Sequence, residues 1–357
     1  MVEKADIRFL TFAEIEGFFL ENNEKSFRAR QVYEWIWRKT CHSFGEMTSL
    51  SRDTRQLLED HFCFPVIRPE QELRDPDGTV KSTFRLADEE LIESVLIPAD
   101  KRTTACISSQ AGCALACRFC ATGMLGFRRN LTFTEIFDQV VLLNRQSEKF
   151  HGKPLSNIVY MGMGEPLMNY DSVMKSIERI TAEDSLGMSP QRITVSSVGI
   201  PAMIRRMADD KARFHFALSL HAATNAKRDL IIPINKKHPL QELTEALKYY
   251  HTITGKRFTI EYILFKDFND SLEDAKDLAL FCKSFPVKVN LIEYNPMRKS
   301  GFSPTTPEKM VAFREFLEQK NMVINVRKSR GKNIDAACGQ LALVDRMNRQ
   351  EEGKATT

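Results

Sequence analysis

The stretch CALACRFCATG, residues 113–123, places three cysteines at the spacing C-x3-C-x2-C. Cys113, Cys117 and Cys120 can point inward from one tight loop, and thiolates are the natural ligands of iron–sulfur clusters. A structural zinc site is the alternative, although such a site is usually tetrahedral and closed by a fourth Cys or His. The nearest further cysteine, Cys106, lies on the preceding predicted strand. The spacing therefore favours a cluster and leaves zinc open.

Outward from this loop, strand-like and helix-like segments alternate along the chain. Strand-like TTACISS precedes the cysteines, helix-like TFTEIFDQVVLLNRQ follows them, and the alternation gives six strand–helix units in all. A final strand, MVINVRKS, leads into the C-terminal tail. Because apolar strands separated by helices are typical of a parallel sheet covered by helices, we predict an α/β fold, a partial (β/α)6-type barrel.

Two smaller units precede the alternating region. Residues 11–62 show three helical patterns, and we expect Ser26 and Ser51 to cap the second and third. Residues 67–98 show short alternating segments and the turn DPDG at 75–78, which predict a few antiparallel strands. The expected units are a helical N-terminal domain (1–65), a β-rich joining region (66–98), the α/β core (99–333) and a C-terminal tail (334–357).

Composition places the chain among ordinary globular proteins, with 43% hydrophobic and 27% charged residues. No apolar run approaches the roughly 18 residues of a membrane-spanning helix, so we expect no membrane partner. The N-terminal MVEKADIRFLTF has charges where a signal peptide would be apolar, which predicts a cytoplasmic, reducing location. There, eight cysteines favour metal or redox chemistry over a disulfide framework.

Further motifs follow the predicted strands, where a parallel β/α fold has its catalytic rim. MGMGEP, residues 161–166, combines glycines that permit close backbone approach with Glu165, a carboxylate suited to an ammonium group. An ordinary Gly-rich turn is the alternative. Polar residues that end other strands often only satisfy backbone groups, but here they complete one candidate rim. They are Ser196, Ser219, His221 and Asn295.

Six motifs together resemble the RlmN family of radical S-adenosylmethionine (SAM) adenine methyltransferases, with the Cfr enzymes as near relatives. The motifs are CISSQAGCALACRFCATG, YMGMGEPLMNY, ALSLHA, IPINK, EYNP and IDAACGQLA. In the radical SAM superfamily, three cysteines bind three irons of one [4Fe-4S] cluster, and SAM chelates the fourth iron. The resemblance therefore implies a radical SAM barrel, with the cluster held by Cys113, Cys117 and Cys120.

The resemblance also implies an activity. RlmN-like enzymes methylate carbon 2 of adenosine 2503 in 23S rRNA and of adenosine 37 in tRNAs, and they use two SAM for each methylation. One SAM methylates Cys338, and the second yields a 5′-deoxyadenosyl radical that removes hydrogen from that methyl group. Glu93 matches the proton acceptor, and Cys106 matches the thiol that forms a transient disulfide with Cys338. Without the resemblance, Cys338 reads as a small buried residue and Glu93 as an exposed strand carboxylate.

The same mapping implies further partners. We expect 23S rRNA, tRNA and an electron donor such as flavodoxin as partners, and a monomeric protein. The implied SAM contacts are Gly164, Glu165, Ser196, Ser219, Leu220, His221 and Asn295.

Basic clusters give independent support for RNA binding, since Lys and Arg neutralise phosphates; solvated surface is the alternative. Arg128 and Arg129 follow the cysteine loop, and a basic run from Arg327 to Lys332 precedes Cys338. The aromatic residues of the N-terminal domain suit either RNA contact or core packing. They are Tyr33, Trp35 and Trp37.

Two details bear on the choice among related activities. The family commonly has acidic residues before IDAACGQL, whereas this chain has Lys332 and Asn333, which changes the charge near Cys338. Pro166 favours carbon 2 over carbon 8, because Cfr enzymes typically have alanine there. The alternatives are a Cfr-like carbon 8 adenosine methyltransferase and a non-catalytic, zinc-stabilised RNA-binding protein.

Overall fold

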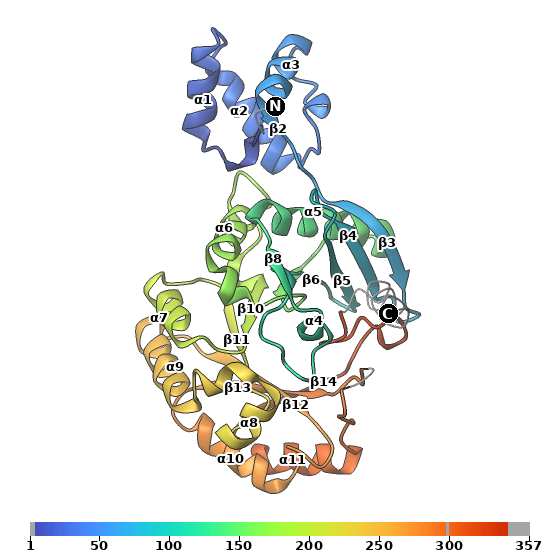
Figure 1. Ribbon diagram of the computed structural model, residues 1–357, viewed down its shortest axis with the longest axis vertical. Helices are drawn as coiled ribbons and strands as arrows, with labels where there is room; N and C mark the ends of the chain where they lie inside the picture. Colours follow the sequence, from blue (N-terminus) through green and yellow to red (C-terminus); the bar gives the residue numbers. More distant parts are fainter. Residues whose placement is uncertain (1–3, 298–299, 342–357) are drawn as a thin grey trace, which may run out of the picture.

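The computed structural model describes residues 4–297 and 300–341, and within this part ten strands form one open sheet in the order β14-β13-β12-β11-β10-β9-β6-β5-β4-β3 (Figure 1). Within this sheet, β6 and β9 to β14 run parallel to one another, and β5, β4 and β3 extend the sheet with antiparallel pairing. The strand bounds are β3 Arg68–Arg74, β4 Val80–Arg85, β5 Leu91–Ala99, β6 Arg102–Cys106, β9 Asn157–Tyr160, β10 Ile193–Ser197, β11 His215–Ser219, β12 Phe258–Leu264, β13 Val287–Glu293 and β14 Val323–Arg327.

Helices connect the parallel strands, which confirms the predicted alternation of strands and helices and the α/β fold class. Local signals start them: the Thr132 hydroxyl accepts the Glu135 N–H (3.2 Å) while the Glu135 carboxylate accepts the Thr132 N–H (2.8 Å), a capping box at α5. Within the described residues, no helix is long and apolar enough to cross a membrane. The helix bounds are α5 Phe133–His151, α6 Tyr170–Thr181, α7 Pro201–Asp209, α8 Asn225–Ile231, α9 Leu240–Thr254, α10 Leu272–Cys282 and α11 Pro307–Gln319.

A helical module precedes the sheet and lies beyond α5 and α6 in Figure 1. Ser51 caps its third helix by accepting the Thr54 N–H (3.1 Å), as predicted. The prediction for Ser26 was wrong: its backbone is already helical, and its side chain makes no capping hydrogen bond. The chain turns one residue earlier, where the Lys25 carbonyl accepts the Arg28 N–H (3.0 Å). The module contains β1 Ala5–Asp6, α1 Phe12–Glu21, α2 Phe27–Tyr33, a π-helix Glu34–Arg38, α3 Arg52–His61 and β2 Phe62–Cys63.

Two aromatic residues of the module, Tyr33 and Trp37, contact the α/β core rather than project into solvent. Trp37 is only 2% exposed and packs edge-on against Phe137 of α5, with ring centroids 5.3 Å apart. Tyr33 is half-buried and accepts a hydrogen bond from Arg179 of α6 (2.5 Å). Core packing therefore accounts for Trp37, and the module is joined to the core through these rings.

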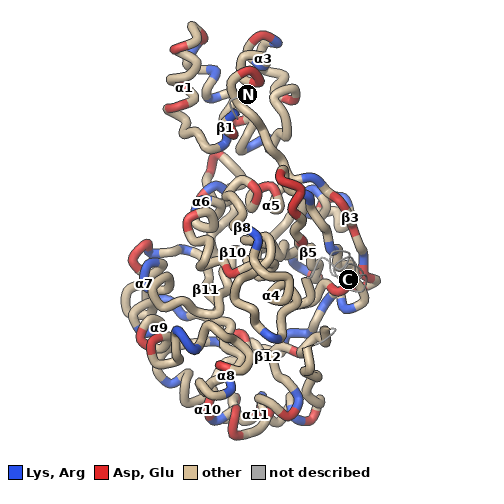
Figure 2. Tube along the Cα trace, viewed as in Figure 1, with Lys and Arg blue, Asp and Glu red and all other residues tan. Residues whose placement is uncertain are grey.

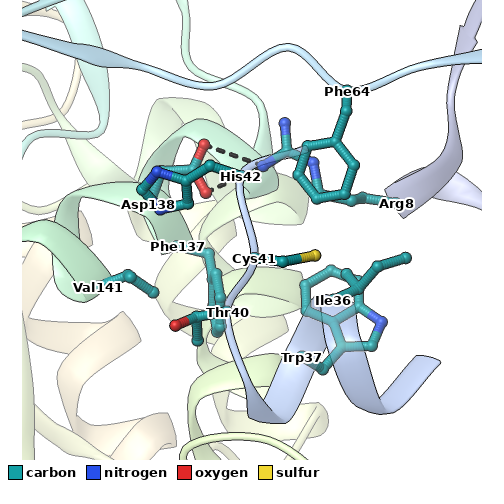
Figure 3. Close-up of a pocket in the computed structure, with 10 residues that line it drawn as sticks. All are labelled: Arg8, Ile36, Trp37, Thr40, Cys41, His42, Phe64, Phe137, Asp138 and Val141. Atoms are coloured by element: carbon teal, nitrogen blue, oxygen red, sulfur yellow. Dashed lines mark hydrogen bonds and ion pairs between the residues drawn. The ribbon is translucent and has the colours of Figure 1, made fainter. Parts of the chain in front are cut away.

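A buried ion pair fastens the same junction (Figure 3). Arg8 donates to both carboxylate oxygens of Asp138 on α5 at 2.9 Å, and the Phe64 ring lies 4.9 Å from its guanidinium. The cavity beside them has a volume of about 10 Å³, room for roughly one water. Removing one member of such a pair typically costs about 3–5 kcal/mol, so this junction is a stable joint rather than a ligand site.

Candidate active site

A short hairpin, β7 Gln110–Gly112 and β8 Phe127–Asn130, carries the cysteine loop after strand β6. The Cys113 N–H donates to the Gly126 carbonyl (2.9 Å), and the Cys120 N–H donates to the Cys117 carbonyl (3.1 Å). The next residues form α4, Ala121–Met124. Gly123 packs so closely that a Cβ there would lie 3.0 Å from the Cys117 nitrogen. Most backbone hydrogen bonds of this loop are therefore local, and the Arg118 N–H adds one to the Ile231 carbonyl at the end of α8 (3.0 Å).

The three thiols fit an iron–sulfur cluster. Burial raises the pKa of Cys113 to about 12, and burial together with the Cys120 and Cys113 thiols raises the pKa of Cys117, so a cation must offset their thiolates. Within residues 4–297 and 300–341, no three His, Cys, Asp or Glu side chains lie close enough together to hold one metal ion. The cysteines of a [4Fe-4S] cluster bind different irons, so their thiols need not surround one ion.

An apolar shell surrounds this loop at the carboxyl ends of the parallel strands. Phe119, directly before Cys120, packs edge-on against His221 (4.8 Å between ring centroids) and against Phe265 (5.6 Å). Phe265 in turn contacts Tyr294 (4.9 Å). Such a shell limits solvent access, which is one way a protein tunes a metal centre.

Arg228 of α8, which no sequence motif marks, lies buried beneath the same loop. Its guanidinium donates to the carbonyls of Val198 (2.5 Å) and Leu220 (3.1 Å) and to the side-chain oxygen of Asn235 (2.7 Å). Burial lowers the pKa of Arg228 to about 10, while the nearby Cys117 thiol opposes that shift. A buried cation beside the Cys117 thiol suits an anionic metal–thiolate group.

The glycine-containing turn after β9 is shaped by close packing. Gly164 has φ +97°, and a Cβ there would lie 2.5 Å from the Cβ of Gln110. The Glu165 carboxylate is buried and accepts the N–H groups of Leu167 and Val198, each at 3.0 Å. Burial raises its pKa, and hydrogen bonds from Ser197 and these amides oppose the shift. The turn therefore aims one fixed carboxylate at the rim.

The other predicted SAM contacts lie at the ends of neighbouring strands. The hydroxyls of Ser196 (β10) and Ser219 (β11) are 3.2 Å apart. Leu220 is fully buried, and Asn295 follows β13 at 4% exposure. His221 accepts the Ile263 N–H on Nδ1 (3.1 Å), and burial lowers its pKa to about 3, so its ring is neutral. The structure thus brings these residues to one edge of the sheet.

The C-terminal tail brings Cys338 to the cysteine loop. The Ala121 N–H donates to the Gly339 carbonyl (2.7 Å), and the Thr122 hydroxyl donates to the Leu341 carbonyl (2.7 Å). Cys338 is exposed, whereas its sequence context without the family resemblance predicts a small buried residue. The tail therefore docks on α4, immediately after Cys120, although the two segments are more than 200 residues apart in sequence.

Cys106, at the end of β6, lies close enough to Cys338 for the two thiols to interact electrostatically. Burial raises the pKa of Cys106 to about 12, the Cys338 thiol adds to the shift, and Arg327 opposes it. Arg327 itself is held by Glu261 through a contact of 3.2 Å. All eight cysteines are free, so the structure does not support a standing disulfide between Cys106 and Cys338.

Glu93 is buried on β5, contrary to the reading as an exposed carboxylate. It is 3% exposed, and the ammonium of the equally buried Lys81 lies 3.5 Å from its Oε1. The Ser108 hydroxyl donates to the Glu93 carbonyl (2.6 Å), which ties β5 to the segment that leads into the cysteine loop. Lys81 is the second residue of β4, VKSTFR, and no sequence motif marks it as a buried residue.

Comparison with known proteins decides the family. Two family models match, the ribosomal RNA large subunit methyltransferase N-terminal domain over residues 6–64 and the radical SAM superfamily over residues 107–279. The chain is 52% identical over 339 residues to a probable dual-specificity RNA methyltransferase RlmN of Christiangramia forsetii, covering 95% of this chain and 96% of that protein. The chain belongs to the RlmN family.

Further relatives agree with this assignment to the RlmN family of radical SAM RNA methyltransferases. A protein of the same description from Flavobacterium johnsoniae is 50% identical, covering 96% of this chain and 98% of the relative. The solved structure of a radical SAM methyltransferase from Sphaerobacter thermophilus is similar at a TM-score of 0.89 and 38% identity, covering 94% and 99% of the two chains. The predicted radical SAM barrel is confirmed, and the superfamily implies a [4Fe-4S] cluster and SAM.

The basic clusters of this RlmN-family chain differ in what they contact. Arg129 is held by Asp88 (2.5 Å) and Glu135 (2.8 Å), whereas Arg128 beside it is exposed; Figure 2 shows this basic pair on β8. Lys332, which stands where the resemblance predicts an acidic residue, donates to the Glu293 carboxylate at 2.8 Å. Its positive charge therefore has a partner in the structure. The sequence also has a basic pair at Arg298 and Lys299, and this pair lies outside the described residues.

Proposed function

We propose that this chain methylates carbon 2 of adenosine 2503 in 23S rRNA and of adenosine 37 in tRNAs, with Cys338 as the methyl carrier and two SAM used per methylation. The docking of the Cys338 tail on α4, directly after Cys120, carries this proposal. It puts a carrier thiol beside the three-thiol loop, with Cys106 and Glu93 on the neighbouring strands.

The chemistry explains why a carrier thiol is needed. Carbon 2 of adenine is electron-poor and the methyl group of SAM is electrophilic, so polar transfer cannot join them directly. A thiolate accepts the methyl group readily, which gives Cys338 its first role. When bound, the cluster on Cys113, Cys117 and Cys120 and its SAM supply the one-electron chemistry, including the radical that abstracts hydrogen from the carried methyl group.

The rim residues divide the work of holding SAM. Glu165 would bind the ammonium group, because its carboxylate is fixed at the rim by two amides. The hydroxyls of Ser196 and Ser219 suit the ribose, and neutral His221 and Asn295 supply hydrogen-bonding groups beside them. Close backbone approach at Gly164 and the buried Leu220 complete the surface.

Three side chains would complete the transfer. After the methylene carried by Cys338 has added to carbon 2, the Glu93 carboxylate accepts the carbon 2 proton and the adduct gives up its unpaired electron, which the bound cluster would accept, so that a closed-shell adenine stays linked to Cys338 through the methylene. The Cys106 thiolate then attacks the Cys338 sulfur, the sulfur–carbon bond breaks, and the methylene leaves with the electron pair and takes a proton to become methyl. The resulting disulfide returns to two thiols with two electrons from a thiol reductant. Arg327, whose charge favours the Cys106 thiolate, is placed for this step.

RNA must present an unstacked adenine to this site, which costs a few kcal/mol. Exposed Arg128, next to the cysteine loop, suits a phosphate contact that offsets part of this cost. The N-terminal module, anchored rigidly through Arg8 and Asp138, adds a second surface that structured RNA can contact.

The proposal is tested by nucleoside mass spectrometry. Anaerobically reconstituted protein with SAM, a flavodoxin reducing system and transcripts of 23S rRNA or tRNA should yield 2-methyladenosine. Protein that holds iron, sulfide and SAM but methylates no base would contradict it. A product methylated at carbon 8 would indicate a Cfr-like activity, and one zinc without iron or sulfide would indicate a non-catalytic RNA-binding protein.

A further inference from the structure

The turn between β3 and β4 binds the C-terminal tail. The Asp77 carboxylate accepts the Gly331 N–H, and the Asp75 carboxylate accepts the Asn333 N–H, each at 3.0 Å. Gly331, at φ +65°, packs so closely on the turn that a Cβ there would lie 2.9 Å from Thr79 Cγ2. The sequence indicated a turn at this place; the structure shows that its two carboxylates hold the backbone of a segment from the far end of the chain.

Lys81, at the second position of β4, contacts both the tail and Glu93. Its ammonium lies 3.4 Å from the Asp335 carbonyl and 3.5 Å from Glu93 Oε1. Lys81 and Glu93 are 4% and 3% exposed, so neither charge is compensated by bulk water. Because a buried charge is costly when its partner moves away, these contacts fix the tail, the ammonium and the carboxylate relative to one another.

We propose that the β3–β4 hairpin sets the distance between Cys338 and Glu93, with Lys81 as the positioning residue and Asp75 and Asp77 as the clamp on the tail. This inference rests on the proposed function, in which Cys338 carries the methylene and Glu93 accepts the proton from carbon 2. The proton passes from the covalent protein–RNA adduct to the Glu93 carboxylate, which becomes a carboxylic acid. Lys81 neither gives nor takes a proton; it holds the acceptor and the tail in register.

Lys81→Met tests the positioning role in cluster-loaded protein. Loss of the ammonium should leave Cys338 methylation and iron content intact but slow release of 2-methyladenosine by about 10- to 100-fold, as expected for a misplaced acceptor. The covalent protein–RNA adduct, measured on denaturing gels with labelled RNA, should accumulate. Lys81→Arg keeps a cation and should recover part of the rate, whereas Lys283→Met, at an exposed lysine, should behave as wild type.

Asp77→Asn tests the clamp without touching the Lys81–Glu93 pair. The amide has one acceptor oxygen for the two N–H groups that Asp77 holds, those of Thr79 and Gly331, so the clamp weakens. Trypsin should then cleave after Arg330 and Lys332 roughly two- to tenfold faster, the range for one net hydrogen bond. Glu183→Gln, at an exposed carboxylate after α6, is the matched control.

Wild-type cleavage rates in Asp77→Asn, or wild-type turnover without adduct in Lys81→Met, would overturn the inference. Absence of 2-methyladenosine with wild-type protein would instead contradict the proposed function, while the cleavage assay would still decide whether the hairpin holds the tail.

Discussion

The cysteine loop and the Cys338 tail meet at α4, but they are built in different ways. The loop folds mostly through contacts within residues 110–130, such as those from Cys113 to Gly126 and from Cys120 to Cys117. The tail is held by residues that precede it by most of the chain, above all Asp75, Asp77 and Lys81. Local spacing therefore specifies where the cluster binds, whereas long-range contacts specify what lies opposite it.

The largest effect should come from the loop. Cys117→Ala removes one of three cluster ligands, so we expect iron and sulfide content to fall to near zero and 2-methyladenosine formation to disappear. Colorimetric iron and sulfide analysis after anaerobic reconstitution measures the first effect. Cys282→Ala, at a buried cysteine of α10 far from the loop in sequence, is the control and should keep its cluster. A Cys117→Ala protein with a full cluster would contradict the assignment of this ligand.

The tail should show the opposite pattern. Cys338→Ala should abolish base methylation as completely as Cys117→Ala does, yet its iron and sulfide content should equal that of wild type. The reason is that Cys338 is exposed on the tail and lies beside, not within, the three-thiol loop. Mass spectrometry of RNA products and metal analysis of the same sample separate the two variants. Cluster loss in Cys338→Ala would make this cysteine a ligand and end the distinction between the regions.

An intermediate effect is expected beneath the loop, at Arg228. Arg228→Gln leaves the carbonyls of Val198 and Leu220 without a charged donor, and each unpaired buried acceptor costs about 1–3 kcal/mol. We therefore expect the cluster-free protein to unfold at lower urea concentration, and the cluster of the loaded protein to have a more negative reduction potential because a nearby positive charge is gone. Spectroscopic potential titration measures the second effect. An unchanged potential would mean that Arg228 only supports the backbone.

The features that could be predicted from the sequence are those set by local contacts, and the features that could not are those set by contacts distant in sequence. The loop, the strand–helix alternation and the rim from Glu165 to Asn295 could be predicted, because spacing and period are local properties of a sequence. Ser26 was assigned wrongly because a serine before a helix does not reveal whether its own backbone is already helical. Lys81 and Arg228 were missed because each is defined by partners distant in the sequence, and Glu93 was read as exposed because its strand is covered by the segment that leads into the cysteine loop.

The smallest effect should appear in the pH dependence of stability. His221 has a pKa of about 3 in the folded chain against an ordinary value of 6.5, so the unfolded chain binds more protons between these values. Stability should therefore fall as the pH drops below about 6.5, by up to roughly 1.4 kcal/mol per unit from this group. His221→Asn, which keeps an acceptor for the Ile263 N–H, should flatten this slope in urea titrations of cluster-free protein at pH 5 to 6.5. Asp77→Asn changes the β3–β4 turn and its contact with the tail, and the pKa of the Asp77 carboxyl it removes lies below the ordinary value of 3.8, outside this pH range. An equal flattening in that variant would therefore contradict the assignment of the slope to His221.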